Sequence, residues 1–265
     1  MADSQLQEIA KLADLAEAGV NSEGGAGADI TWHSASHTDA GRVRHTNEDA
    51  FLDSEEQRLW AVADGMGAHS RGDYASSAVV AQLRAFPRQN SVLANLKDME
   101  TRLQVAHEKC RTAFRKHRPG TTVAAMHAHG NYCFLLWAGD SRIYRLRDSE
   151  LQQLTQDHSM AQEKFSRGEL TEQEMESHHS AHVLTRSVGA HRNLRLEMHY
   201  SPVQAGDRYL LCSDGLYNPV EFGEICAVMG QGSPEEACKS LVDLALEGGG
   251  PDNITVVVVD ARQSG

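Results

Sequence analysis

Three apolar runs in this sequence end in the same way, and this repeated ending constrains the fold more than any other feature. The runs LWAVADG, FLLWAGDS and YLLCSDG each lead into an aspartate followed by Gly or Ser, at Asp64, Asp140 and Asp214. Short apolar runs that stop at turn-forming residues are typical of buried β-strands. A fourth aspartate, Asp252, lies directly before the apolar run NITVVVVD. The sequence therefore predicts several buried strands with an acidic residue at one end.

Further strand-like runs and three helical patterns fill most of the remaining chain. The strand-like runs are residues 58–64, 121–129, 132–140, 141–147, 207–214 and 253–260. Apolar residues recur at helical spacing in residues 74–86, 96–114 and 234–246. Because long apolar strands without a polar face need cover on both sides, we expect two packed sheets flanked by helices.

The N-terminal part and one internal segment differ from this pattern. Residues 5–18 carry an amphipathic helical pattern, and residues 21–29, NSEGGAGAD, have the composition of a linker. We therefore divide the chain into an N-terminal helix and glycine-rich linker, 1–29, and one domain, 30–265. Residues 160–182 are polar and lack a strand pattern. They predict a helical, mobile flap at about 160–185.

Composition argues against several classes of partner. The formal net charge is -12, and no cluster of Lys and Arg is interleaved with aromatic residues, so nucleic acid is not an expected partner. The five cysteines form no CxxC pair, which is typical of a reduced, cytoplasmic protein. No stretch approaches the ~18 consecutive apolar residues that a membrane span requires. We expect a cytoplasmic monomer without a membrane anchor.

The four aspartates predict a metal centre if they meet. Strand ends in a sandwich gather at common rims, and converging carboxylates raise each other's pKa unless a cation neutralises them. Ligands that are all oxygen, including the backbone carbonyl of Gly65, favour Mg²⁺ or Mn²⁺ over Zn²⁺. Two such ions about 3.5 to 4 Å apart can activate a bridging water for in-line attack on phosphorus. For any single aspartate, ordinary turn chemistry is the better interpretation; four matched sites make that interpretation weak.

A fifth motif, GRVRHTNEDAFL, precedes a short apolar run near the start of the domain. The planar guanidinium of Arg44 suits the oxygens of a phosphate, while Glu48 and Asp49 could hold water molecules around the ions. A surface salt bridge between Arg44 and Glu48, four residues apart, is the alternative for this motif.

These segments resemble the bacterial branch of the metal-dependent type 2C (PPM) serine/threonine protein phosphatases, in family order from about residue 38 to residue 260. The matching segments are GRVRHTNEDAFL, LWAVADGMGAHSRGDYAS, GTTVAAMHA, WAGDSRIYRLRDSELQQLTQDHS, HVLTRSVGA, YLLCSDGL and GGPDNITVVVV. The resemblance implies an α+β fold: a four-layer αββα sandwich with two central antiparallel β-sheets, flanking helices and a helical flap. The implied reaction is hydrolysis of phosphoserine and phosphothreonine in proteins.

The resemblance also implies a role for each acidic residue. Asp64, Asp214 and Asp252 would bind the first Mn²⁺ or Mg²⁺ ion, and Asp64 with the Gly65 carbonyl would bind the second. Asp140 and Asp214 match a third metal site of bacterial members. The flap would border the active site and influence substrate choice.

The motif around Arg44 corresponds to the phosphate-binding arginine of the family, with Glu48 and Asp49 as its outer acidic pair. The sequence departs from the family pattern at Ala68, where a second glycine is common, and at Met66, where eukaryotic relatives carry a histidine proposed as general acid. The proton for the leaving group would then come from solvent, from water at the metal or from another residue. His69 is a candidate for that role, although a solvated loop histidine is the simpler interpretation.

Three weaker possibilities stay open at this point. The histidines His178, His179 and His182 have the spacing of zinc ligands but lack a companion Cys or carboxylate motif. A binding module that has lost catalysis, or a hydrolase of nucleotides and other phosphodiesters, would be the rival functions. The expected partners are phosphoproteins and a serine/threonine kinase of the same cell.

Overall fold

The computed structural model describes residues 30–67, 71–114, 118–176 and 178–264. The helix predicted at 5–18, the linker, Ala68 and His69 lie outside the described residues. Two five-stranded sheets form the centre of the molecule, and every strand pairing within them is antiparallel. None of the described helices has the length and apolar character that a membrane crossing requires.

The first sheet contains, in spatial order, β1 (Ile30–Asp39), β12 (Ile254–Gln263), β11 (Arg208–Cys212), β8 (Arg142–Arg147) and β9 (Glu150–Gln153). The second contains β10 (Glu197–Pro202), β7 (Tyr132–Ala138), β6 (Val123–His129), β3 (Leu59–Ala63) and β2 (Ala50–Ser54). A short separate pair joins β4 (Gly65–Met66) to β5 (Gly120–Thr121).

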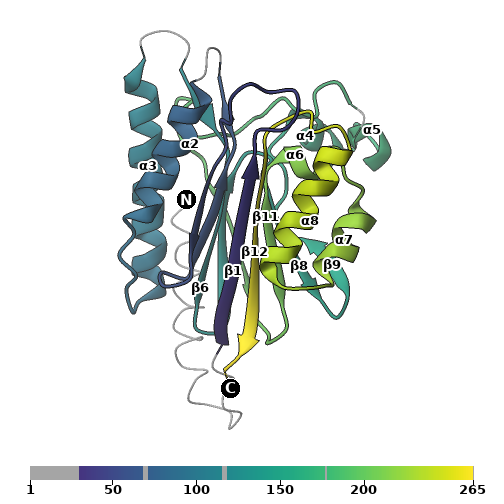
Figure 1. Cartoon of the computed structure of the whole chain (residues 1–265). Helices are drawn as coiled ribbons and strands as arrows, with labels where there is room; N and C mark the ends of the chain where they lie inside the picture. The colour runs from purple at the N-terminus through teal and green to yellow at the C-terminus, as the bar shows by residue number, and fades with distance from the viewer. Residues whose placement is uncertain (1–29, 68–70, 115–117, 177, 265) are drawn as a thin grey trace.

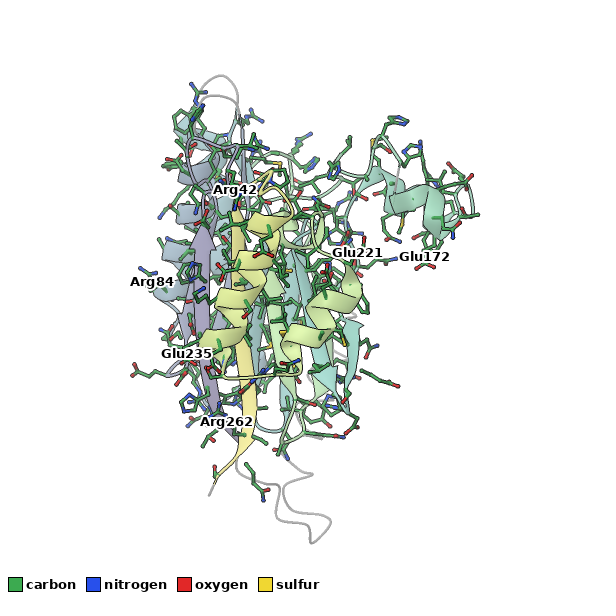
Figure 2. The ribbon with its side chains drawn as sticks, turned by 45° about the vertical axis from the view of Figure 1, so that its right-hand side comes forward. Arg42, Arg84, Glu172, Glu221, Glu235 and Arg262 are labelled. Atoms are coloured by element: carbon green, nitrogen blue, oxygen red, sulfur yellow. The ribbon has the colours of Figure 1, made fainter. Side chains whose placement is uncertain are left out.

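Helices cover the outer faces of both sheets, which gives four layers (Figure 1). On the second sheet lie α2 (Gly72–Arg84) and α3 (Val92–Ala113). On the first sheet lie α6 (Asp214–Tyr217), α7 (Phe222–Met229) and α8 (Pro234–Glu247). The flap contains α4 (Met160–Ser166) and α5 (Glu172–Glu176), and α5, which carries Glu172, stands away from the body (Figure 2).

Three apolar clusters hold these layers together. One lies between the two sheets and includes Trp60, Tyr209 and Val257, which are buried completely. The other two lie between each sheet and its helices. Because the central strands bury side chains on both faces, β3 and most of β12 are buried along their length. This explains why the sequence shows continuous apolar runs there rather than alternation.

The helices begin where the sequence supplies a capping group. Ser91 and Ser233 accept hydrogen bonds from backbone N–H groups of the first turns of α3 and α8, and Ser159 does the same for α4. At α8, Glu236 returns a hydrogen bond to the backbone of Ser233 and completes a capping box. The three predicted long helices are therefore present with shifts of a few residues at their ends.

The predicted α+β class, with two antiparallel sheets between helices, is confirmed. The sequence interpretation missed the strands β1, β2, β4, β9 and β10 and the helices α6 and α7. In β1 only Trp32 is buried, so this edge strand carries polar residues on most positions and gave no apolar run. The flap is only partly helical, because turns and bends separate α4, α5 and the chain that follows them.

Candidate active site

The predicted site residues come from loops at one end of the sandwich. Asp64 and Asp140 follow β3 and β7 of the second sheet, while Asp214 follows β11 and Asp252 precedes β12 of the first sheet. Arg42, in the loop after β1, marks this end, and Arg262 marks the opposite end (Figure 2). The two sheets thus contribute acidic residues to the same rim.

The backbone of Asp64 is fixed by two threonines of the neighbouring strands. The Asp64 carbonyl oxygen accepts hydrogen bonds from the N–H of Thr122 and the hydroxyl of Thr121, both at 2.9 Å. In return, the Asp64 N–H donates to Oγ1 of Thr122 at 2.9 Å. The Thr122 hydroxyl also lies 2.6 Å from the hydroxyl of Ser141, next to Asp140. One hydrogen-bonded chain therefore sets the relative positions of two acidic loops.

Two glycines allow the loops to approach one another closely. A Cβ atom at Gly65 would lie 2.4 Å from the carbonyl oxygens of Glu48 and Gly72. A Cβ atom at Gly215 would lie 1.9 Å from the carbonyl oxygen of Asn253. Any side chain at these positions would push the loops apart, so the close approach requires glycine. The DG pairs that end two of the apolar runs are thus packing requirements as well as turn signals.

The side chain of Asn253 ties the Asp252 loop to the loop that carries Glu48. Its Oδ1 accepts a hydrogen bond from the N–H of Glu48 at 2.8 Å. Its Nδ2 donates to the carbonyl oxygens of Ala40 and Thr46, both at 2.9 Å. Asn253 therefore orders the loops around the acidic rim.

Asp49 shows that the rim contains an oxygen without a protein donor. The carboxylate is buried, and its Oδ2 accepts a hydrogen bond from Ser213 at 2.8 Å. Its Oδ1 is also buried, and no described residue donates a hydrogen bond to it. Burial, only partly offset by its hydrogen bonds, raises the pKa of Asp49 to about 7. Leaving such an oxygen unsatisfied costs on the order of 1 to 3 kcal/mol, which a proton or a cation would remove.

The acidic side chains also raise each other's pKa. Burial and the charges of Asp49, Asp214, Asp140 and Asp252 raise the pKa of Asp64 well above its ordinary value. Burial and the charge of Asp214 raise the pKa of Asp140 to about 8. The Asp214 pKa is raised by burial and by Asp252. These mutual effects require that the carboxylates lie near one another, and they fit a site for divalent cations with oxygen ligands.

Arg44 reaches across this rim to Asp252. Its Nη2 lies 2.6 Å from Oδ2 of Asp252, and its side chain is 56% exposed. The hydrogen bond to Asp252 and the charge of Asp252 raise the pKa of Arg44, with smaller contributions from Asp214 and Asp64. The spacing of four residues also allowed an ion pair between Arg44 and Glu48. In the structure the ion-pair partner of Arg44 is Asp252 instead.

Two of the rim carboxylates form contacts with other side chains in the structure. Arg44 binds Asp252, and Asn218 donates a hydrogen bond to Asp214. Within the described ranges, no three acidic, His or Cys side chains stand close enough together to hold an ion without rearrangement. The acidic residues therefore lie at one rim, but their side chains would have to turn to share a ligand.

Several residues near the rim were not predicted from the sequence. Asn218 donates to Oδ2 of Asp214 at 3.1 Å from the next turn of α6, a spacing of four residues that could have revealed it. The Tyr217 hydroxyl donates to the Asp140 carbonyl oxygen at 3.0 Å. From the flap, Nδ1 of His182 lies 4.0 Å from Oδ2 of Asp214, and no spacing in the sequence indicates that contact.

Comparison with known proteins identifies the class of enzyme. The profile of the family described as Protein phosphatase 2C matches residues 35–243, which is most of the chain. The chain therefore belongs to the protein phosphatase 2C family, whose members are metal-dependent serine/threonine protein phosphatases. The predicted family, fold class and enzyme class are confirmed.

Named relatives and solved structures agree with this class. The chain is 37% identical over 243 residues to the serine/threonine protein phosphatase PstP of Mycobacterium tuberculosis, covering 85% of this chain and 44% of that protein. It is 32% identical to the serine/threonine phosphatase stp of Listeria innocua, over 86% of this chain and 95% of that protein. The chain thus spans less than half of the mycobacterial relative.

Two solved structures show the same fold with clear sequence similarity. PppA, described as a key regulatory component of T6SS in Pseudomonas aeruginosa, is 40% identical, with a TM-score of 0.79 over 87% of this chain and 97% of that chain. The catalytic domain of the Mycobacterium tuberculosis PstP, solved in complex with two manganese ions, is 36% identical, with a TM-score of 0.77 over 88% of this chain and 99% of that chain.

Proposed function

We propose that this chain removes phosphate from phosphoserine and phosphothreonine in proteins, and that the reaction takes place at the rim formed by Asp64, Asp214 and Asp252. The observation that carries the proposal is the mutual electrostatic effect of these carboxylates, which come from both sheets. Bound cations would relieve this repulsion, and the family to which the chain belongs is metal-dependent. The manganese ions in the PstP structure support Mn²⁺ as one suitable ion.

The candidate ligands follow from the positions of the oxygens. Asp64, Asp214 and Asp252 would hold one ion, and Asp64 with the carbonyl of Gly65 a second. Asp140 lies close enough to raise the pKa of Asp64, so Asp140 and Asp214 are the candidates for a third ion. Bound divalent ions, Mn²⁺ or Mg²⁺, supply an activated water and neutralise charge on the phosphoryl oxygens.

Arg44 would bind the substrate phosphate by exchanging partners. Its guanidinium is half exposed and already lies over the rim, at 2.6 Å from Asp252. With Asp252 as a ligand of an ion, the same guanidinium would be free to donate two parallel hydrogen bonds to phosphate oxygens. This exchange orients the phosphorus toward the rim.

Glu48 and Asp49 would act on water rather than on substrate. The hydroxyl of Ser213 fixes one oxygen of Asp49 and leaves the other directed into the buried rim. The backbone of Glu48 is fixed by Asn253 and by Ser76, whose hydroxyl donates to the Glu48 carbonyl at 2.5 Å. Both carboxylates are thus positioned to accept hydrogen bonds from water molecules that surround the ions.

The biological setting follows from the class of enzyme. We propose that the chain acts in the cytoplasm as a monomer on phosphorylated proteins, opposing a serine/threonine kinase of the same cell. The relatives from Mycobacterium tuberculosis and Listeria innocua are named as serine/threonine phosphatases, which supports this class of substrate.

The test is hydrolysis of p-nitrophenyl phosphate and of a phosphothreonine peptide, with Mn²⁺, with Mg²⁺ and with a chelator. We expect metal-dependent release of phosphate from both substrates, and its loss in Asp214→Asn. If the wild type is inactive with every divalent ion, the rival interpretation as a binding module is correct. If a phosphodiester is hydrolysed faster than the phosphopeptide, the chain is a phosphodiesterase instead.

A further inference from the structure

A pocket of about 300 Å³ lies beside the flap, and its charge is opposite to that of the protein as a whole. Three arginines line it, Arg186, Arg192 and Arg195, together with His191, and one carboxylate, Glu163, stands on its wall. The whole chain carries a formal net charge of -12. A locally positive pocket on an acidic protein selects anions from solution, because the remaining surface repels them.

The interior of the pocket contains hydroxyl groups that need partners. Oγ1 of Thr185 and Oγ of Ser187 are buried, and neither has a hydrogen-bond partner among the described residues. Ser187 is only 2% exposed and lines the pocket. A buried hydroxyl without a partner is unfavourable. An anion with several oxygens would accept hydrogen bonds from these hydroxyls and from the arginines at the same time.

The loop that carries the arginines is fixed by neighbouring elements. The N–H of Gly189 donates to Nδ1 of His107 at 3.0 Å, and His107 is fully buried on α3. The guanidinium of Arg111, also on α3, donates to the carbonyl oxygen of Arg192. Val188 pairs with Thr121 through hydrogen bonds of 2.8 and 3.0 Å. The loop is thus attached to α3 on one side and to β5 on the other.

The arginines of the pocket are not all engaged elsewhere. Nη1 of Arg186 lies 2.9 Å from Oε2 of Glu197, so its charge is partly used within the protein. Arg192 and Arg195 are exposed, and neither side chain forms an ion pair with a described residue. These two residues supply the charge that a ligand would meet.

The pocket is close enough to the acidic rim for one peptide to reach both. His182, 4.0 Å from Asp214, and Ser187 in the pocket are five residues apart in the sequence. Five extended residues span at most about 17 Å. Thr121, the pairing partner of Val188, also binds the carbonyl oxygen of Asp64. A substrate residue within about five positions of the phosphorylated one could therefore enter the pocket.

We propose that this arginine pocket binds an acidic or phosphorylated side chain of the same phosphoprotein whose phosphate is removed at the rim. The proposal rests on the proposed function and adds to it a substrate preference. The recognised chemistry is an anion with several oxygens, which a carboxylate, a second phosphorylated residue and free inorganic phosphate share. The connection of the pocket to the rim favours a group on the substrate itself.

The test compares phosphothreonine peptides that differ only in their flanking residues: neutral residues, one Glu at each position up to five residues on either side, or a second phosphothreonine. For wild type we expect kcat/KM to be about fivefold to tenfold higher for the best acidic peptide than for the neutral one, because the acidic peptide has the lower KM. In the double variant Arg192→Ala/Arg195→Ala this ratio falls to about one. The ratio is insensitive to a general loss of active protein, and Arg84→Ala, on the surface of α2, serves as the matched control.

A second variant changes the pocket in the opposite direction. Glu163→Gln removes the only carboxylate among the lining residues and should increase the ratio. Added salt should reduce it. A ratio of one in wild type, or an unchanged ratio in the double variant, overturns the proposal while the phosphatase function stands. If inorganic phosphate raises the Tm of wild type but not of the double variant, and acidic residues have no effect, the pocket takes a free anion and the proposal is also overturned.

Binding of the same peptides by fluorescence anisotropy separates this proposal from the proposed function. If no peptide is hydrolysed with any ion but acidic peptides still bind more tightly to wild type than to the double variant, the proposed function fails and the pocket is retained. If hydrolysis proceeds and binding shows no dependence on acidic residues, the pocket is rejected.

Discussion

The two ends of the sandwich treat buried carboxylates in opposite ways. At the end away from the rim, the side chain of Asp207 is fully buried, and each of its oxygens accepts a hydrogen bond of 2.6 Å from Arg147. Its Oδ2 also accepts from the N–H of Gln204 and the hydroxyl of Tyr209. Asp260 is bound in the same way by Arg208, at 2.5 and 2.9 Å. At the rim, by contrast, Asp140 is buried and Asp64 and Asp214 are half-buried. These three carboxylates raise one another's pKa, and the half-exposed Arg44 pairs with Asp252 rather than with them.

This difference separates carboxylates that stabilise the fold from carboxylates that serve a reaction. Asp207 and Asp214 flank the same strand, β11, so the sequence context of the two residues is similar. What differs is the partner: a guanidinium from β8 binds Asp207, whereas the neutral amide of Asn218 binds Asp214 and a neighbouring carboxylate, Asp252, raises its pKa. A buried acidic group whose charge the protein does not neutralise is unfavourable unless a bound cation supplies the charge.

The largest effect is expected from Asp214→Asn. Removal of one charged ligand candidate should lower kcat/KM for a phosphothreonine peptide by about 10²- to 10³-fold, because charge stabilisation in the transition state is lost. The Tm without metal should stay the same or rise, since one source of repulsion is removed. Steady-state kinetics and calorimetry on the same sample check both statements. Unchanged activity would place the reaction elsewhere.

The next effect is the dependence of stability on pH in the absence of metal. Burial and neighbouring charge raise the pKa of Asp140 to about 8, and burial chiefly raises that of Asp49 to about 7. Groups with a raised pKa in the folded state stabilise it fully below their unfolded pKa, near 4, and lose this contribution as pH rises to 8. With chelator, the free energy of unfolding should therefore fall between pH 5 and pH 8, by about 3 to 4 kcal/mol through Asp140 alone.

Saturating Mn²⁺ provides the control for this pH dependence. Protons compete with the cation for the same carboxylates, so stability with metal should rise over the same pH range. Urea denaturation at several pH values measures both trends. If the slope is the same with and without metal, the rim does not bind cations and the comparison between the two ends fails.

Asp207→Asn tests the opposite end, with a smaller effect. The substitution weakens the paired hydrogen bonds from Arg147 and should lower the free energy of unfolding by about 2 kcal/mol. Because the residue lies away from the rim, kcat/KM of the folded protein should change less than twofold. Equilibrium denaturation and kinetics at a temperature well below Tm separate the two effects. A large loss of activity with unchanged stability would contradict the division between the ends.

The sequence revealed the positions of the carboxylates but not their partners. An apolar run followed by Asp and a turn residue is a local signal. The sequence alone therefore placed Asp64, Asp140 and Asp214 at strand ends. The partner of Arg44 could not be found in this way. Local spacing suggested Glu48, whereas the structure pairs Arg44 with Asp252, which is 208 positions away. Only the topology of the first sheet, in which β1 and β12 are neighbours, brings those loops together.

Dependence on contacts between distant segments also explains why the sequence did not reveal the arginine pocket. Two arginines of the pocket, Arg192 and Arg195, lie in HRNLR, a segment without a recognisable spacing, and Arg186 and the buried hydroxyl of Ser187 precede it. The position of this loop depends on α3, which binds the loop through His107 and Arg111. Long-range contacts of this kind carry no local pattern. Fold class and acidic residues were therefore predictable, whereas the electrostatic character of each surface was not.

The smallest expected effect belongs to Arg44, the residue that links the acidic rim to solvent. In Arg44→Ala, KM for a phosphothreonine peptide should rise about tenfold, because two hydrogen bonds to the phosphate are lost while the carboxylates stay in place. Arg44→Lys should recover part of this loss, since charge is retained without the planar fork. Arg84→Ala, an exposed arginine on α2, should leave KM unchanged. If Arg44→Ala instead lowers kcat and the affinity for Mn²⁺ without changing KM, then Arg44 positions Asp252 rather than phosphate, and its ion pair is the functional contact.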